Sequence, residues 1–233
     1  MRMRKKKNGE ARLEACRELL VKKPELIPGK EVFLEIGAGK GGFAVGMCSK
    51  HRGVQYFAME KVSDCVVLAA EKAKEMIAKD GSCENLCFLI DNADNLTSLF
   101  PSESVDRIFL NFSDPWSKKG YAKRRLTHRR YLAVYMQLLK NGGSLRFKTD
   151  NVPLFNFTLD ELSAVGLDVN ILTRDLHSSP WAEDNVVTEY EAAFSAQGIS
   201  INMLEVTKPV GFSMPIEESL LPGRREYVSR ASE

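Results

Sequence analysis

Residues 111–126, NFSDPWSKKGYAKRRL, place one carboxylate beside a dense group of cations. Asp114 follows an apolar run and precedes Pro115 and Trp116. A fixed carboxylate can stabilise positive charge that develops during a reaction. Lysine and arginine side chains bind phosphates and so hold nucleic acid with little sequence specificity. We expect phosphate contacts from Lys118, Lys119, Lys123, Arg124, Arg125, Arg129 and Arg130.

The distribution of charge supports a polyanionic partner more strongly than the net charge does. The chain has 33 Lys+Arg against 31 Asp+Glu, and a formal charge of +2 does not by itself drive strong binding to nucleic acid. Cations instead crowd Met1–Lys7 and Lys118–Arg130. Each run marks a place where a polyanion could be held, and the alternative for each is a solvated face.

A second chemical feature is the glycine-rich stretch EIGAGKGG, Glu35–Gly42, where glycines let the backbone approach a ligand closely. The dinucleotide fingerprint G-x-G-x-x-G is matched by Gly37, Gly39 and Gly42. Glu60 follows about 20 residues later, as the ribose-binding acid of that fingerprint does. A P-loop is excluded, because Lys40 is followed by Gly41 and not by serine or threonine.

An S-adenosylmethionine (SAM) site of the pattern E-x-G-x-G-x-G explains more of these residues. The pattern is filled by Glu35, Gly37, Gly39 and Gly41. SAM carries an ammonium and a sulfonium but no phosphate, so the Glu35 carboxylate attracts it and would repel a pyrophosphate. Glu60 can accept from both ribose hydroxyls, and Asn92 or Asp94 can read the adenine edge. The alternative for each polar residue is a solvated strand end or an N-cap.

A mostly parallel sheet must position these residues, because short apolar runs alternate with helical patterns from Glu31 onward. Predicted strands cover residues 31–36, 54–60, 85–90, 105–112 and 143–150. The strongest predicted helix, residues 62–80, has an apolar stripe and ends at Gly81. After Asp150 we expect helices near 154–165 and 186–196 and strands at 167–173 and 199–206. The last two strands indicate an antiparallel edge.

We therefore expect an α/β, Rossmann-like fold with a seven-stranded sheet, divided into three segments. Residues 1–30 form a basic arm with a short helix over about 11–21, residues 31–208 form the catalytic domain, and residues 209–233 form an irregular tail. The sheet resembles the ligand-binding α/β folds, whose sites lie at the carboxyl ends of the strands.

The cysteines and the hydropathy indicate a protein of the reducing cytoplasm. Five cysteines show neither C-x-x-C spacing nor a partnering histidine cluster, which argues against a disulfide framework and against a metal site. No apolar run reaches the roughly 20 residues that span a bilayer. The basic N-terminus lacks the apolar segment of a signal peptide.

Five motifs resemble those of the tRNA (guanine-N7)-methyltransferase family. They are EIGAGKGGF, AMEK, NFSDPWSKKGYAKRRL, FKTDN and VTEYEAAFSAQG, and the resemblance runs from about Arg2 to Lys208. It implies a SAM-dependent enzyme that methylates N7 of a guanine in the tRNA variable loop, at position 46 in the family. The chain departs modestly at Ser117, where the family often has proline, and at Asn92, where it often has aspartate. The segment before Glu31 is shorter than in many members.

The resemblance also implies roles for individual residues. SAM contacts are implied for Glu35, Glu60, Asn92 and Asp114, with Asp114 also the catalytic residue. Guanosine contacts are implied for Lys118, Asp150, Thr188, Glu189, Tyr190 and Glu191. A carboxylate such as Asp150 or Glu191 could accept hydrogen bonds from guanine N1–H and N2–H₂. Trp116 would either stack on a base or pack in the core. We expect a monomer or a homodimer.

Three alternatives remain open at this point. An exocyclic-amine methyltransferase would share the SAM site, although it would use a polar-Pro-Pro-aromatic turn in place of NFSDPW. A non-catalytic RNA-binding partner subunit would share the fold, since a fold alone does not establish catalysis. A nicotinamide-dependent dehydrogenase would explain the glycines but not the cations that follow Trp116.

Overall fold

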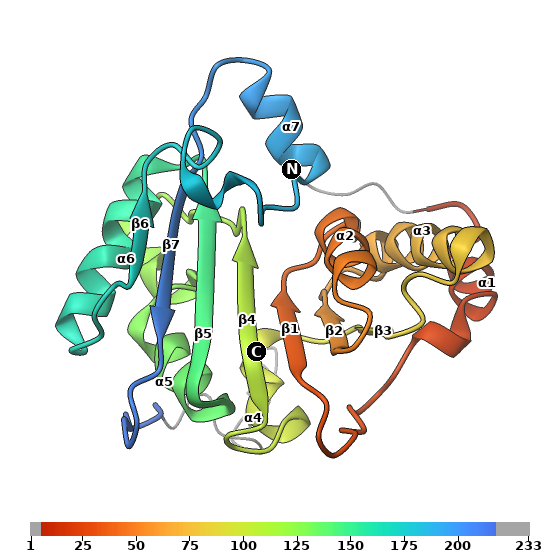
Figure 1. Cartoon of the computed structure of the whole chain (residues 1–233), viewed down its shortest axis with the longest axis horizontal. Helices are drawn as coiled ribbons and strands as arrows, with labels where there is room; N and C mark the ends of the chain where they lie inside the picture. The colour runs from red at the N-terminus through yellow and green to blue at the C-terminus, as the bar shows by residue number, and fades with distance from the viewer. Residues whose placement is uncertain (1–5, 218–233) are drawn as a thin grey trace, which may run out of the picture.

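Within residues 6–217, which the computed structural model describes, seven strands form one sheet in the order β3-β2-β1-β4-β5-β7-β6 (Figure 1). The strands are β1 Val32–Ile36, β2 Gln55–Met59, β3 Leu86–Leu89, β4 Val105–Asn111, β5 Leu139–Thr149, β6 Ile171–Thr173 and β7 Asn202–Thr207. β1 to β5 run parallel, while β7 is antiparallel to β5 and β6. The predicted mostly parallel sheet with an antiparallel edge is confirmed.

Helices cover both faces of the sheet, which explains why its central strands are apolar on both sides. The α-helices are α1 Gly9–Glu14, α2 Gly42–Lys50, α3 Ser63–Asp80, α4 Leu96–Leu99, α5 Arg129–Leu138, α6 Val152–Ala164 and α7 Glu189–Ser195. The 3₁₀ helices are η1 Arg17–Leu19, η2 Ala93–Asn95, η3 Lys119–Arg124 and η4 Pro180–Ala182. One apolar core lies under α4, α5 and α6, and a second lies under η1, α2 and α3.

The main departures from the predicted elements have local causes. β5 begins at Leu139, directly after α5, and not at residue 143 as predicted. Leu139 already pairs with Val105 of β4, and residues 140–143 form an irregularity before the regular pairing resumes at Ser144. Gly143 permits this close approach, since a Cβ there would lie 2.9 Å from the Asp106 carbonyl oxygen. β6 keeps only three residues of the predicted strand at 167–173. α7 begins three residues later than predicted, at Glu189, because Thr188 caps it.

The N-terminal segment packs against α3 and the edge of β3. Its helical part is split into α1 and η1, and it begins and ends two residues earlier than the predicted span of 11–21. Arg12 donates to both carboxylate oxygens of Glu71 at 2.7 and 2.6 Å. Leu20 then forms a parallel bridge with Phe88, so this segment covers one edge of the sheet. Of the basic run Met1–Lys7, only the last two residues lie within the described part.

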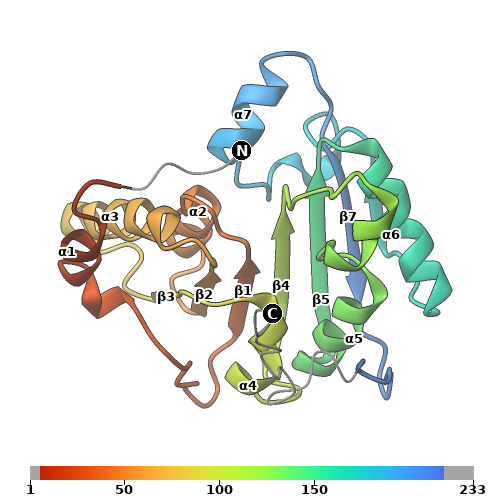
Figure 2. The same ribbon diagram turned by 180° about the vertical axis from the view of Figure 1, so that it is seen from behind.

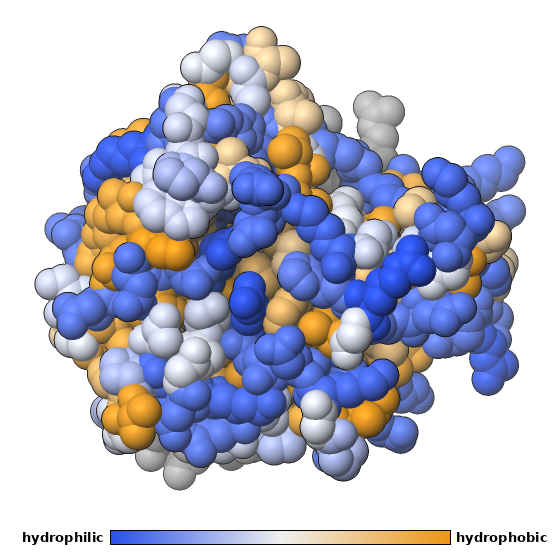
Figure 3. Space-filling model, viewed as in Figure 1, coloured by the Kyte–Doolittle hydropathy of each residue, from blue (hydrophilic) through white to orange (hydrophobic). Residues whose placement is uncertain are grey.

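The surface of the described part offers no membrane-crossing element. None of its helices is both long and apolar enough to pass through a bilayer. Figure 3 shows the face seen in Figure 1 as mostly hydrophilic, with scattered hydrophobic areas. Residues 208–217 contain neither helix nor strand, and the remainder of the predicted tail, 218–233, lies outside the described residues.

Candidate active site

The candidate residues gather at the carboxyl ends of the parallel strands. Glu35 lies near the end of β1, Glu60 follows β2, Asp114 lies in the loop after β4, and Asp150 follows β5. The short helix α7 lies beyond these strand ends in both ribbon views (Figures 1 and 2). Open α/β sheets bind ligands at this edge.

Three glycines shape the loop between β1 and α2. The φ angle is +83° at Gly37, +54° at Gly39 and +75° at Gly41, a region that other residues rarely adopt. A Cβ at Gly41 would also lie 2.6 Å from the Cβ of Ala69 in α3. The loop therefore requires glycine for its path and, at Gly41, for its packing.

Glu60 ties the end of β2 to this glycine-rich loop. Its Oε2 accepts a hydrogen bond from the Gly39 N–H at 3.0 Å, and its Oε1 accepts from the Val62 N–H at 2.9 Å. A carboxylate has about four acceptor positions. These two bonds therefore leave capacity for the hydroxyl groups of a ribose.

Glu35 is a buried carboxyl group with only one of its oxygens satisfied. The residue is 1% exposed, and its Oε1 accepts from Asn111 Nδ2 at 2.9 Å. Among the described residues, none forms a hydrogen bond of ordinary geometry with Oε2, although the buried Tyr56 hydroxyl lies near enough to act on the pKa of Glu35. Burial raises the pKa of Glu35 to about 7, against the opposing effects of the Asn111 hydrogen bond and the Lys148 charge. An ammonium group would supply the missing donor and charge, so this site fits the ammonium of SAM.

The polar residues after β3 form a local hydrogen-bonded turn. Asn92 caps η2, and its Oδ1 accepts from the Asp94 N–H at 3.3 Å. Asp94 accepts from the Tyr131 hydroxyl at 2.7 Å and from Arg130 at 3.3 Å, both in α5. Asp94 is thus engaged with α5, and Asn92 is the better candidate for an adenine contact.

The loop after β4 contains two residues other than glycine with positive φ, and hydrogen bonds from Arg125 hold its backbone. The φ angle is +50° at Phe112 and +41° at Trp116. Such conformations cost about 1–3 kcal/mol each and persist only where their surroundings impose them. The Arg125 guanidinium donates to the carbonyl oxygens of Pro115 at 2.9 Å and Trp116 at 3.2 Å. The loop is therefore held in place, while the Asp114 side chain that it carries is exposed.

Part of the cationic block faces solvent next to this loop. The exposed cations whose side chains form no hydrogen bond with another described residue are Lys118, Lys119, Lys123 and Arg124; Arg129 is also exposed but pairs with Glu161. Arg124 lies over two aromatic rings, 5.1 Å from the centroid of Trp116 and 4.6 Å from that of Tyr121. Trp116 and Tyr121 contact each other edge to face at 5.9 Å. This surface combines cations with aromatic rings, a composition suited to unpaired nucleotides.

The remaining arginines of the block have partners inside the protein. Arg129 donates through its guanidinium to both oxygens of Glu161, at 2.9 and 3.0 Å. Arg130 lies 3.3 Å from Asp94 and 2.8 Å from the Tyr131 hydroxyl. Together with Arg125, they act in the structure as internal ties, which the sequence pattern alone did not distinguish from phosphate-binding residues.

The first turn of α7 contains a capping box. Thr188 Oγ1 accepts from the Glu191 N–H at 2.9 Å, and Glu191 Oε2 accepts from the Thr188 N–H at 3.3 Å. Glu191 is 0% exposed, and its carboxylate is occupied by Lys148, His177 and Asn185. The structure thus buries a carboxylate that the sequence analysis assigned to guanosine.

The other residues of that segment face outward. Glu189 pairs with Lys72 of α3 at 2.5 Å. The Tyr190 ring is 46% exposed and lies 5.0 Å from the ring of Phe112. Burial, followed by the nearby charge of Asp150, raises the pKa of Tyr190. Asp150 and Tyr190 are therefore neighbours at the strand ends.

Sequence reasoning missed Lys148, His177 and Asn185. The signal for Lys148 was a lysine in a strand predicted to be buried, where lysine is almost never found unless it is paired. No comparable signal marked His177, whose partner Glu191 is 14 residues away. In the part of the chain that is described, no three His, Cys, Asp or Glu side chains gather in a way that could hold a metal ion.

Comparison with solved structures identifies the fold. The chain resembles the 16S rRNA methyltransferase KamB with a TM-score of 0.59 and 14% identity, covering 86% of this chain and 94% of that one. It resembles an antibiotic-related methyltransferase with a TM-score of 0.56 and 18% identity, covering 76% and 86%. At these identities the likeness concerns the fold alone.

Sequence comparison identifies the family. A family model described as "Putative methyltransferase" matches residues 29–204. A tRNA (guanine-N(7)-)-methyltransferase of Lachnoclostridium phytofermentans is 41% identical over 199 residues, covering 82% of this chain and 91% of the relative. Its counterpart in Bacillus subtilis is 37% identical over 215 residues, covering 88% and 98%. The chain therefore belongs to the tRNA (guanine-N(7)-)-methyltransferase family.

Proposed function

We propose that the protein transfers the methyl group of SAM to N7 of a guanine in tRNA, at position 46 of the variable loop. The carrying observation is the buried Glu35, whose unsatisfied Oε2 lies at the same sheet edge as the strained loop that presents Asp114. The Glu35 carboxyl group fits a cationic donor, and the Asp114 carboxylate fits a cationic product. Family membership supports the same assignment.

The donor would be held by the residues that end the first three strands. Glu35 would pair with its ammonium group, Glu60 would accept from its ribose, and Asn92 would contact its adenine. The glycines Gly37, Gly39 and Gly41 would allow the backbone to approach it. When bound, SAM supplies an electrophilic methyl group on a sulfonium.

Asp114 would stabilise the charge that the reaction creates on guanine. N7 carries an in-plane lone pair at neutral pH, so the acceptor needs no general base. Methylation places positive charge on the imidazole part of the base, and a fixed carboxylate stabilises that charge. The structure supports pre-positioning, because Arg125 holds the backbone on the C-terminal side of Asp114. Correct alignment of donor and acceptor can itself supply about 7–11 kcal/mol.

Asp150 would bind the other edge of the guanine. A carboxylate accepts two hydrogen bonds and so can pair with guanine N1–H and N2–H₂. Of the two carboxylates proposed for this contact, Glu191 is buried and fully occupied, whereas Asp150 is partly exposed. The exposed ring of Tyr190 would form one wall of the same site, and Lys118 and the start of α7, Thr188 and Glu189, would border it.

The exposed cations beside this site would hold the tRNA backbone. We assign phosphate contacts to Lys118, Lys119, Lys123 and Arg124, because their side chains are exposed. Among the described residues, Lys123 has only a long ion pair with Glu217, at 3.9 Å, whereas the other three arginines form hydrogen bonds within the protein. Every residue of the proposed site comes from one chain, so a monomer and a homodimer would be equally competent. The free thiols of all five cysteines suit the reducing cytoplasm.

One experiment tests this proposal. Purified protein is incubated with SAM and an unmodified tRNA transcript, and the nucleosides are identified by mass spectrometry. We expect 7-methylguanosine from a transcript with guanine at position 46 and none from one with adenine there. A nucleoside methylated on an exocyclic amine would overturn the proposal.

A further inference from the structure

Lys148 of β5 is a buried cation to which the proposed reaction gives no role. It is 1% exposed, although lysine is almost never buried unless it is paired. An unpaired ammonium in the interior is strongly unfavourable, so its environment must supply partners.

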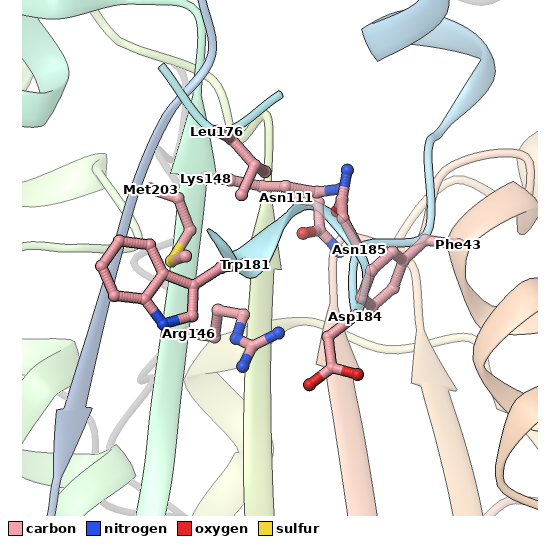
Figure 4. Close-up of a pocket in the computed structure, with 9 residues that line it drawn as sticks. All are labelled: Phe43, Asn111, Arg146, Lys148, Leu176, Trp181, Asp184, Asn185 and Met203. Atoms are coloured by element: carbon pink, nitrogen blue, oxygen red, sulfur yellow. The ribbon is translucent and has the colours of Figure 1, made fainter. Parts of the chain in front are cut away.

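Its hydrogen-bond partners all come from the segment before and within α7, and its ammonium also lies 4.9 Å from the ring centroid of Phe43. Lys148 Nζ donates to Glu191 Oε2 at 2.5 Å, to Asn185 Oδ1 at 2.8 Å and to the Val186 carbonyl oxygen at 2.8 Å. These three bonds use all three hydrogens of the ammonium. Figure 4 shows the Lys148 side chain extending toward Asn185 beside Asn111.

Glu191 extends the network to further parts of the same segment. Its Oε1 lies 2.7 Å from His177 Nε2 and accepts from Asn185 Nδ2 at 2.6 Å. Although burial acts in the opposite direction, the Lys148 charge and these hydrogen bonds lower the pKa of Glu191. Burial also lowers the pKa of Lys148, while the charge and hydrogen bond of Glu191 act in the opposite direction. The hydrogen bonds of this pair jointly fix residues 177, 185, 186 and 191.

The fixed segment connects the two sides of the site. On the donor side, a Cβ at Gly46 of α2 would lie 2.4 Å from Val186, so the contact is tight. Lys72 pairs with Glu189 and also donates to the Lys40 carbonyl oxygen of the glycine-rich loop, at 3.3 Å. On the acceptor side, the Tyr190 ring packs against the strained loop after β4.

We propose that Lys148 is a positioning residue for methyl transfer. Through Glu191 it holds residues 186–191 between the glycine-rich loop and the guanine side of the site, and so sets Tyr190 relative to the donor. The role presupposes the guanine site proposed above. The hydrogen bonds of Lys148 reach none of the groups assigned to the donor's ribose and adenine, so we expect its main effect on the acceptor. On the donor side Lys148 acts through its charge, which lowers the pKa of Glu35 against the larger effect of burial.

The test compares Lys148→Met with Lys208→Met. Lys208 is a matched control, because it is also buried, 4% exposed, and donates to the Leu139 carbonyl oxygen at 2.8 Å and to Glu103 at 3.1 Å. It directly follows β7 and contacts the start of β5, whereas Lys148 lies near the end of that strand. We expect kcat/KM for tRNA to fall about a hundredfold in Lys148→Met. The Kd for SAM should change much less than kcat/KM, because the donor side loses only the effect of the Lys148 charge on Glu35.

Lys208→Met should lose stability but keep its kinetic constants. A folded Lys148→Met variant with normal kcat/KM for tRNA would overturn the inference. So would a loss of SAM affinity equal to the loss of kcat/KM.

A second variant covers the case in which Lys148→Met does not fold. Lys148→Met with Glu191→Leu replaces the buried ion pair by an apolar pair, a change that is often neutral or stabilising. We expect its melting temperature to recover while kcat/KM stays low, because the ties to Asn185, Thr188 and His177 remain lost. Full recovery of kcat/KM would show that the pair serves stability only.

Hydrogen exchange separates this inference from the proposed function. Measured on the free protein, amides of residues 186–195 should exchange faster in Lys148→Met than in Lys208→Met. Unchanged exchange would overturn the positioning role whatever the activity. If the wild-type protein makes no 7-methylguanosine but the two variants still differ in exchange, the proposed function is refuted, whereas the anchoring of residues 186–195 by Lys148 is not.

Discussion

Replacing Glu35 by glutamine should stabilise the free protein and weaken its affinity for SAM. Glu35 is buried, and its pKa of about 7 lies well above the ordinary value of 4.5. At about 1.4 kcal/mol per pH unit, this difference corresponds to about 3 kcal/mol in the free energy of unfolding. Glutamine keeps an acceptor for Asn111 and removes the charge.

The pH dependence follows from the two pKa values. Below pH 4.5 the carboxyl group is protonated in both the folded and the unfolded protein, and its charge does not affect folding. Above about pH 7 the folded protein must bury a carboxylate that the unfolded chain keeps in water. As the pH rises from 4.5 to 8, we expect the wild type to lose about 3 kcal/mol relative to Glu35→Gln.

Two assays measure these effects. Urea unfolding at pH 5 and pH 8 compares the free energies of unfolding, and calorimetric titration gives the Kd for SAM. Loss of a charge-assisted hydrogen bond worth about 1.5–3 kcal/mol should raise that Kd about tenfold to a hundredfold. In the wild type the Kd should also rise below about pH 7, where the carboxyl group must lose a proton to pair with an ammonium. Equal stability of the two proteins at pH 8 together with unchanged SAM affinity would refute the reasoning.

Three further mutational tests address other parts of the protein. Asp114→Asn should lower kcat about a hundredfold. Its melting temperature should not change, because the side chain is exposed. A folded variant with a normal kcat would contradict the proposed charge stabilisation. The double variant Lys123→Ala with Arg124→Ala should reduce the slope of log K for tRNA binding against log salt concentration by about 2. The distant Lys30→Ala should leave this slope unchanged. An unchanged slope in the double variant would show that neither residue contacts the RNA. Gly46→Ala should lower the free energy of unfolding by about 1–3 kcal/mol, because its Cβ would lie 2.4 Å from Val186. Adding Val186→Ala should restore part of this loss. If the effects of the two substitutions on the free energy of unfolding simply add, the contact is contradicted.

The fold was largely predictable, because its strands are local patterns. The five central strands are apolar runs bounded by turn residues, and each appears in the structure. The errors fall where local rules compete. Asn141-Gly142-Gly143 resembles a turn, yet these residues lie within β5 as an irregularity opposite β4. The start of α7 was misplaced although Thr188 and Glu191 form a capping box that is readable from the sequence.

The donor side of the site was more predictable than the acceptor side. The glycine-rich loop and Glu60 belong to a single strand-loop-helix-strand unit, so their spacing reports their proximity. The acceptor side depends on contacts between distant residues, such as Lys148 with Glu191. Nor could composition show that Arg129 is paired with Glu161, 32 residues away. A cationic run has the same appearance in the sequence whether its members face phosphate or a carboxylate.

The most direct measurement of the central claim concerns the acceptor atom. Two tRNA transcripts that differ only at position 46 are compared, one with guanosine and one with 7-deazaguanosine, which has carbon in place of N7. We predict transfer of labelled methyl from SAM to the first transcript and none to the second, with equal binding of both. Equal methylation of the two transcripts would contradict the claim that the enzyme methylates N7.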